Sequence, residues 1–214
     1  MALIMYLTRA PRYQNIITDE YETIPRDDIV LIEKYFNWKK AKADGKDSGD
    51  TLEEWCGIPE SKLPHKYIVN YYRDFYTPKK AYSEHFGDME VYSLFEHMAR
   101  FAKANQIFNW FIKHVMNENA NKEYYEVTKK QFEDLLDVCN KVKECFVRNE
   151  DGYIIDEGVA KDLLPIMDKK GYFFGTDSYG KIYAQQVMEA AEAIQNILAT
   201  TDFEKQVVYF NATW

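Results

Sequence analysis

The sequence predicts an α+β fold: one helix-rich domain with a long central helix and a small antiparallel sheet. Three observations support this. Apolar residues recur at helical spacing in several long segments, short apolar or aromatic runs stand between them, and two capping motifs mark where helices begin. The 214 residues, 46% of them hydrophobic, are enough for one domain with a sizeable core, expected to cover residues 1–214.

The first quarter of the chain predicts a strand, a helix, a loop and a second helix. Residues 3–7 are apolar and are expected to form a short strand. Pro25, followed by two aspartates, is typical of a helix start, and this helix is expected to fade at residues 39–42. Residues 42–50 are polar, contain two glycines and predict a flexible loop. The sequence Thr51-Leu-Glu-Glu54 then fits a capping box that opens a short helix.

The middle of the chain predicts two further helices. Residues 65–76 are rich in aromatic side chains at a spacing of four and are expected to be helical. The longest helix is predicted from Met89 to Met116, where one stripe contains Leu94, Met98, Phe101, Asn105, Phe108, Ile112 and Val115. Asn105 is the polar member of that stripe. It is interpreted as a hydrogen-bonded core residue, with a ligand contact as the alternative.

The last part of the chain predicts three strands, a hairpin and two helices. Strands are expected at residues 123–127, 172–174 and 207–210, and a hairpin with Asp151-Gly152 at its turn. A second capping box at Thr128-Lys-Lys-Gln131 opens one helix. The final helix follows Asp177 or Ser178, either of which could cap it, and its apolar face contains Tyr183, Val187, Ala190, Ile194 and Ile197.

Charge and composition argue against several functional classes. The formal net charge is −8, which disfavours binding to duplex nucleic acid or to an anionic membrane and suits a basic partner protein. No run approaches the ~20 apolar residues that a membrane-spanning helix needs, and the start lacks the basic region of a signal peptide. The three cysteines are odd in number and are interpreted as reduced thiols.

The sequence favours a binding protein over an enzyme. None of the four histidines belongs to an HExxH motif, no GxSxG or GxxxxGK[ST] motif occurs, and Cys56 is interpreted as a structural thiol. No catalytic residue, metal site or cofactor is therefore predicted.

Two segments are candidate sites for a partner or ligand. The first is a basic, tyrosine-rich stretch that could stack bases or contact a protein, or could simply pack its rings: Tyr67, Tyr71, Tyr72, Arg73, Lys79 and Lys80. The second is a turn before the final helix, where free amides could bind an anion: Thr176, Asp177, Ser178 and Tyr179. Asp177 would repel a phosphate, and a plain helix cap is the alternative there.

Several runs resemble a family of uncharacterised phage and prophage accessory proteins. They are residues 51–57, 103–112, 124–128, 131–139, 163–165, 171–179, 202–205 and 209–214, so that the similarity covers roughly residues 51–214, and weakly the start at residues 5–7. Some members carry the label "phosphoglycerate kinase", which nothing in this sequence supports. The resemblance implies a mobile-element origin, expression in the cytoplasm of a bacterial host and an accessory role. It transfers no catalytic residue.

Two functional hypotheses remain, with a purely structural or scaffolding role as a third, lesser option. The first is a phage-encoded protein that binds and inhibits a host protein, such as a bacterial defence component, in the manner of an anti-CRISPR protein. The second is a small protein that binds or sequesters a nucleotide, through either of the two candidate segments.

Overall fold

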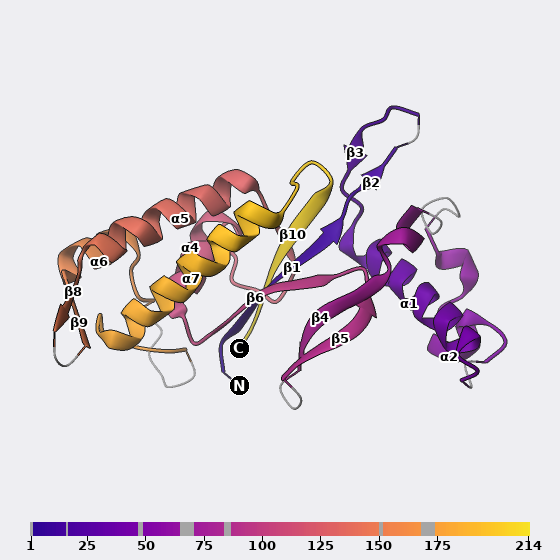
Figure 1. The fold of residues 1–214 in the computed structure, drawn as a ribbon, viewed down its shortest axis with the longest axis horizontal. Coiled ribbons are helices and arrows are strands. Elements are labelled where there is room, and N and C mark those ends of the chain that lie inside the picture. Colours follow the sequence, from indigo (N-terminus) through magenta and orange to yellow (C-terminus); the bar gives the residue numbers. More distant parts are fainter. Residues whose placement is uncertain are drawn as a thin grey trace. The chain divides into compact units, whose positions relative to one another are not determined.

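The computed structural model has the predicted α+β class (Figure 1). It describes residues 2–15, 17–46, 49–64, 71–83, 87–149, 152–167 and 174–214. The helices are α1 (Arg26–Ala43), α2 (Leu52–Cys56), α4 (Asn105–His114), α5 (Lys129–Glu144), α6 (Glu157–Leu163) and α7 (Lys181–Thr200), with 3-10 turns η1 (Glu60–Lys62) and η2 (Arg73–Phe75). The strands are β1 (Ile4–Pro11), β2 (Tyr13–Gln14), β3 (Tyr21–Glu22), β4 (Thr77–Ser83), β5 (Gly87–Ser93), β6 (Glu96–Ala102), β7 (Tyr125–Val127), β8 (Phe146–Asn149), β9 (Gly152–Ile155) and β10 (Gln206–Thr213).

The main sheet has four strands in the order β6-β1-β10-β7, so the first and last strands of the chain are neighbours. The amide of Lys103, just after β6, donates to the carbonyl of Leu3, just before β1. The amide of Arg12, just after β1, donates to the carbonyl of Lys205, just before β10. Each strand therefore ends where its neighbour begins, which is the antiparallel arrangement. β7 pairs with β10 in the same sense, with Val127 opposite Val208. Three two-stranded ribbons complete the strands: β2-β3, β4-β5 and β8-β9.

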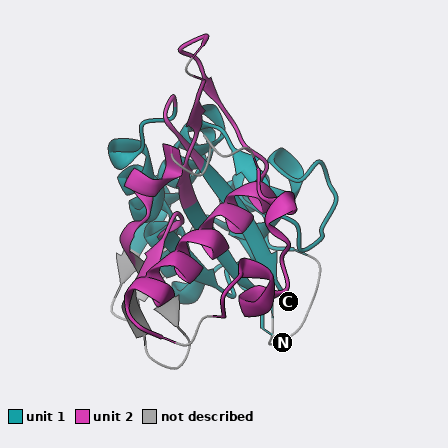
Figure 2. Cartoon of the chain, turned by 90° about the vertical axis from the view of Figure 1, so that its right-hand side faces the viewer, with its two compact units in different colours: residues 1–8, 98–203, 208–214 teal, residues 9–97, 204–207 magenta. Residues whose placement is uncertain are grey.

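Two compact units divide the chain, coloured separately in Figure 2. Unit 1 contains residues 1–8, 98–203 and 208–214, and unit 2 contains residues 9–97 and 204–207. The chain passes from one unit to the other within β1 and β10 and at β6. The boundaries between the units therefore fall inside strands and not in linkers. The expectation of a single domain over residues 1–214 stays a prediction.

Unit 1 holds a large apolar core. Its centre includes Phe111 of α4 and Phe210 of β10, whose rings stack at 4.0 Å between centroids and 9° between planes. The predicted face of α7 is confirmed, since Tyr183, Val187, Ala190, Ile194 and Ile197 are all fully buried. An apolar helix face of this kind is buried against a neighbouring element, and α5 packs beside α7.

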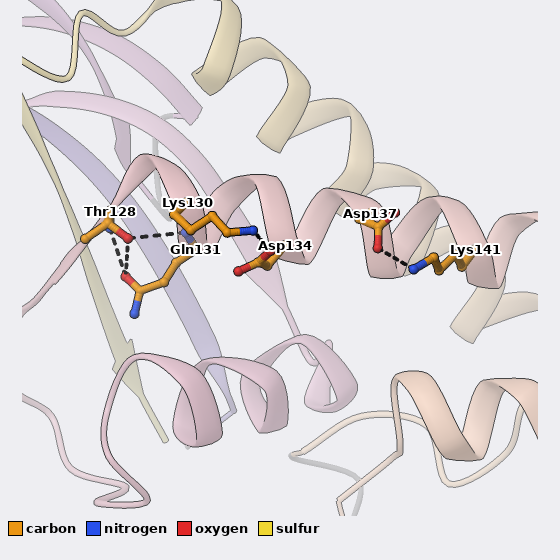
Figure 3. A network of polar contacts seen from close by, with 6 residues as sticks. All are labelled: Thr128, Lys130, Gln131, Asp134, Asp137 and Lys141. Atoms are coloured by element: carbon orange, nitrogen blue, oxygen red, sulfur yellow. Dashed lines mark hydrogen bonds and ion pairs between the residues drawn. The ribbon is translucent and has the colours of Figure 1, made fainter.

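Both predicted capping boxes are confirmed. In each, a threonine hydroxyl accepts the amide hydrogen of the residue three positions later, whose side chain accepts the amide hydrogen of that threonine. Figure 3 shows the box of Thr128 and Gln131 at the start of α5, followed on the exposed side by two lysine–aspartate pairs at i,i+4 spacing. The opposite side of α5 is apolar, which explains why this helix forms where the sequence predicts it.

The long helix predicted from Met89 to Met116 is wrong over its first half. Residues up to Ser93 belong to β5, residues 96–102 form β6, and helix begins only at Asn105. In β6 the buried residues Ala99 and Phe101 alternate with more exposed neighbours, as expected for a strand. Leu94 and Phe101 are buried under either interpretation, so a helical stripe could be drawn through a segment whose backbone pairs with other strands.

Smaller boundaries also differ from the predictions. α1 does not fade at residues 39–42 but continues to Ala43, and Asp47 and Ser48 of the expected 42–50 loop lie outside the described residues. Residues 65–70 of the predicted 65–76 helix and residues 172–173 of the predicted 172–174 strand also lie outside them, while Arg73–Phe75 forms the 3-10 turn η2. The strands at 3–7, 123–127 and 207–210 are confirmed, although β7 begins only at Tyr125. The two strands of the predicted hairpin are confirmed as β8 and β9, with Asn149 opposite Gly152, which already belongs to β9, while Asp151 of the predicted turn lies outside the described residues.

Candidate functional site

The basic tyrosine-rich segment does not form one exposed helical face. Tyr72 is fully buried and its hydroxyl donates to the carbonyl of Pro11, so it serves packing. Tyr71 is half-buried, its ring lies 5.4 Å from that of Tyr13, and burial raises its pKa. Arg73 is exposed beside Asp74, at 3.7 Å. Lys79 and Lys80 belong to β4, and Tyr67 and the side chain of Lys80 lie outside the described residues.

The second predicted segment lies in unit 1 and is organised by local hydrogen bonds. Thr176 Oγ1 accepts the amide hydrogen of Ser178, and the hydroxyl of Tyr179 accepts that of Ile166. The cap prediction is wrong: Gly180 is the N-cap of α7 and makes no side-chain capping bond, while Asp177 and Ser178 are exposed in the turn before it.

Asn105 is confirmed as a hydrogen-bonded core residue. Its side chain is 1% exposed and its Nδ2 donates to the carbonyl of Thr176, at 2.8 Å. The structure thus joins the start of α4 to the turn before α7, which the sequence did not predict.

An open cavity lined by described residues lies in unit 2, near the C-terminal end of α1. It has a volume of about 560 Å³, within the range of small-molecule sites. Its walls come from α1 with the turn after it, α2, the residue just before β4, and β5. They are formed by Asn37, Lys40, Ala41, Asp44, Lys46, Trp55, Tyr76, Val91 and Tyr92. Three aromatic rings and two lysines therefore surround one cavity.

The end of α1 places both lysines at the cavity. The amide of Gly45 donates to the carbonyl of Lys42 and the amide of Lys46 to that of Ala41, which is the Schellman arrangement. Gly45 has a φ of 70°, a left-handed conformation that glycine adopts without strain. This turn brings Lys46 to the cavity that Lys40 and Asp44 also line. It also satisfies the last carbonyls of α1, which would otherwise disfavour an anion.

Tyr76 forms a wall of the cavity and fixes α1 against it. Its ring stacks on Phe36, with 5.3 Å between centroids, and its hydroxyl donates to Asn37 Oδ1. Burial, followed by the nearby Glu33 carboxylate, raises the pKa of Tyr76 to about 12, so the hydroxyl stays protonated at neutral pH. Glu33 in turn accepts hydrogen bonds from Ser93 and the amide of Leu94, which ties α1 to the end of β5.

Trp55 reaches the cavity from α2, whose geometry is set by the first capping box. Glu54 accepts the amide hydrogens of Thr51 and Asp50, and these bonds lower the pKa of its carboxyl group. Lys42 Nζ donates to the carbonyl of Asp50, at 2.9 Å, and so links α1 to the start of α2. Trp55 remains 37% exposed, which leaves its ring accessible to a ligand.

Cations lie beside aromatic rings along α1, both at this cavity and outside its lining. Lys40 Nζ lies 4.5 Å from the centroid of the Tyr92 ring and 3.2 Å from Asp44 Oδ2. Lys39 and Lys42 lie over the Trp38 ring of the same helix, at 5.1 and 4.9 Å. Such surfaces bind planar anions, because rings stack on a base while ammonium groups attract phosphate.

The sequence interpretation missed this site, although a signal was present. Residues 34–46 contain five lysines against one aspartate and include Tyr35, Phe36 and Trp38. The basic, tyrosine-rich stretch from Tyr67 to Lys80 was chosen as a candidate site because it shows the same alternation of lysine or arginine with aromatic residues. The sequence predicts the end of a helix at residues 39–42 and a loop at residues 42–50. This boundary splits the lysine-rich segment, so the sequence does not indicate that residues 34–46 form one surface.

Other chemistry finds less support within the described ranges. No group of three or more histidine, cysteine, aspartate or glutamate side chains there is placed to hold a metal ion. None of the helices in that part of the chain is long and apolar enough to cross a membrane. The three cysteines are free thiols, and burial raises the pKa of Cys139 to about 12.

Comparison with known proteins adds no further assignment, and the resemblance to a phage accessory family stays a prediction. No family model matches the chain, and no curated protein or solved structure is significantly similar to it.

Proposed function

We propose that the protein binds a small, planar, anionic ligand of the nucleotide class in the cavity of unit 2. The observation that carries the proposal is the convergence of Trp55, Tyr76 and Tyr92 with Lys40 and Lys46 around about 560 Å³. A base stacked on an aromatic side chain gains ~1–3 kcal/mol, and the ammonium groups supply the phosphate contact. The hypothesis of nucleotide binding is therefore kept, with these side chains in place of the two segments predicted from sequence.

The test is a calorimetric titration of the full chain with AMP, GMP, CMP and UMP. Tyr92→Ala is expected to weaken binding by about five-fold or more, because it removes a ring that lines the cavity. Tyr124→Ala is the matched control: Tyr92 and Tyr124 are both 43% exposed, but Tyr124 belongs to unit 1. Binding should also weaken as salt is raised, since exposed lysines are screened.

Two results would contradict the proposal. One is the absence of binding by the wild-type chain at millimolar concentrations of all four nucleotides. The other is an equal loss of affinity in Tyr92→Ala and Tyr124→Ala, which would place the ligand elsewhere or make the loss nonspecific.

A second candidate function is the binding and inhibition of a host protein, and the β2-β3 hairpin favours it. Ile17, next to its turn, is 90% exposed, and three acids follow it: Asp19, Glu20 and Glu22. Asn15 Oδ1 accepts the amide hydrogens of Ile17 and Thr18, as asparagine side chains do in turns. An exposed apolar residue among acidic ones suits a basic protein surface with an apolar pocket.

This second candidate has its own test in bacteria. Cells that carry a phage-targeting CRISPR system and express the chain should be infected more efficiently than cells without it, and Ile17→Ser should reduce that gain. Val147→Ser, a change at a 62% exposed residue of unit 1, is the control. Unchanged infection with the wild-type chain would argue against inhibition of that defence system.

A further inference from the structure

Asn37 brings an uncharged polar side chain of α1 to the wall of the cavity, next to Tyr76. Its Oδ1 accepts the hydrogen of the Tyr76 hydroxyl, and both residues line the cavity. Tyr76 keeps that hydrogen at neutral pH, because burial raises its pKa to about 12. The hydrogen bond therefore occupies the oxygen end of the amide and leaves Nδ2 with both of its hydrogens.

The orientation of this amide follows from its contact with Tyr76. The two partner atoms are 2.5 Å apart, a separation found for an O–H donor and an oxygen acceptor and too short for an N–H donor. Asn37 Nδ2 has no acceptor among the residues that the structure describes. The side chain thus presents the cavity with a donor whose partner can come from a ligand.

We propose that Asn37, oriented by Tyr76, makes the cavity prefer nucleotides whose base carries an oxo group over those with an amino group at the same position, an inference that rests on the proposed nucleotide binding. Hypoxanthine, guanine and uracil present an acceptor oxygen there, whereas adenine and cytosine present a second donor. Two donors that face each other both lose a hydrogen bond, which lowers affinity for the amino bases.

The lining of the cavity keeps this amide apart from the charged groups. Asp44 and Lys46 lie at the C-terminal end of α1, and Asn37 lies seven residues before Asp44, about 10 Å along the helix axis. Tyr76, beside Asn37, places its ring 5.6 Å from that of Tyr92. A mononucleotide bound along α1 therefore places its phosphate by the lysine and its base between the rings, with the base edge at Asn37.

The experiment measures by calorimetry two pairs of nucleotides, each differing in an oxo or amino group of the base: IMP against AMP, and UMP against CMP. The wild-type chain is expected to bind the oxo member of each pair about five-fold more tightly, the effect of one hydrogen bond. Asn37→Ala should reduce this preference to about two-fold or less, because the donor is lost. Asn196→Ala, at an exposed asparagine of α7 in unit 1, is the control and should keep the full preference.

Tyr76→Phe tests the orientation of the amide separately. The variant removes the hydroxyl and keeps the ring that stacks on Phe36. The Asn37 amide can then turn either end to the base, so the preference should again fall to about two-fold or less. A role in packing alone would weaken both members of a pair by the same factor and leave their ratio unchanged.

The outcomes separate this inference from the function on which it rests. Equal wild-type affinities within each pair, or tighter binding of AMP and CMP, would overturn the base preference and leave nucleotide binding intact. A full preference in Asn37→Ala would assign the selection to another group, and a full preference in Tyr76→Phe would overturn the orienting role of Tyr76. No binding of any of the four nucleotides by the wild-type chain would overturn the proposed function and this preference with it. The wild-type comparison needs no variant to fold.

Discussion

The two units of the chain use their aromatic residues differently. In unit 1 the rings at the centre of the apolar core are buried, as in the stacked pair of Phe111 and Phe210, whereas Tyr124 is 43% exposed and Lys161 lies over the ring of Tyr179. In unit 2 several rings keep an edge or a polar tip in solvent, and Lys39, Lys40 and Lys42 lie over them. Burial of whole rings stabilises a fold, while half-exposed rings beside cations leave surface for a ligand. We propose on this basis that unit 1 contributes mainly to stability and that unit 2 contains the ligand site.

The largest expected effect is the loss of a core ring. Phe111→Ala in unit 1 should lower the free energy of unfolding by about 3–5 kcal/mol, because it leaves a cavity where two rings now stack. Tyr92→Ala in unit 2 should cost about 0.5 kcal/mol or less, since that side chain is 43% exposed. Urea denaturation measures both. Similar losses of unfolding free energy in Phe111→Ala and Tyr92→Ala would contradict the proposed division of roles between the two units.

The buried thiol of unit 1 predicts a loss of stability in alkali. The pKa of Cys139 is about 12 in the folded chain and ~8.5 in an unfolded one, so both states are protonated below pH 8.5. Between these values the unfolded chain releases the proton first, and stability falls by up to ~1.4 kcal/mol per pH unit. Cys139→Ala should show a shallower fall between pH 9 and 11.

The same thiol should resist modification. At pH 8 a thiol reagent is expected to label Cys56 and Cys145, which are partly exposed, and to reach Cys139 only after unfolding. Rapid labelling of all three thiols in the folded chain would show that unit 1 opens more readily than its burial indicates.

The turn at the end of α1 should depend on its glycine. Gly45 and Gly57 both have a φ of 70° with nothing near the position of an added Cβ, so alanine at either costs backbone strain alone, about 1–2 kcal/mol. Equal losses of stability are expected. Gly45→Ala should in addition weaken AMP binding, because it disturbs the turn that positions Lys46. If Gly45→Ala lowered the free energy of unfolding much less than Gly57→Ala does, the Schellman turn would not be formed in solution.

The smallest expected effects distinguish the two capping boxes. Thr128→Ala and Thr51→Ala should each cost about 1 kcal/mol. Thr128→Ala should leave AMP affinity unchanged, whereas Thr51→Ala should lower it, because α2 carries Trp55 into the cavity. A lower affinity in Thr128→Ala would show that the site depends on unit 1 as well.

The sequence by itself determined the elements that are encoded over a few residues. Both capping boxes, the apolar face of α7 and the β8-β9 hairpin follow from spacings of two to four residues, which are set by backbone hydrogen bonds and side-chain direction. The α+β class followed from counting such elements. The same reasoning recognised Asn105 as a core residue because it lies on an apolar stripe.

Only the tertiary structure decided the pairing of strands and the composition of the site. Whether residues 96–102 form helix or strand depends on their neighbour β1, more than 80 residues away, and local spacing allowed both. The cavity likewise combines side chains from Asn37 to Tyr92 on four elements. Free energy gained by packing between distant segments fixes such arrangements, and no short window of sequence contains that information.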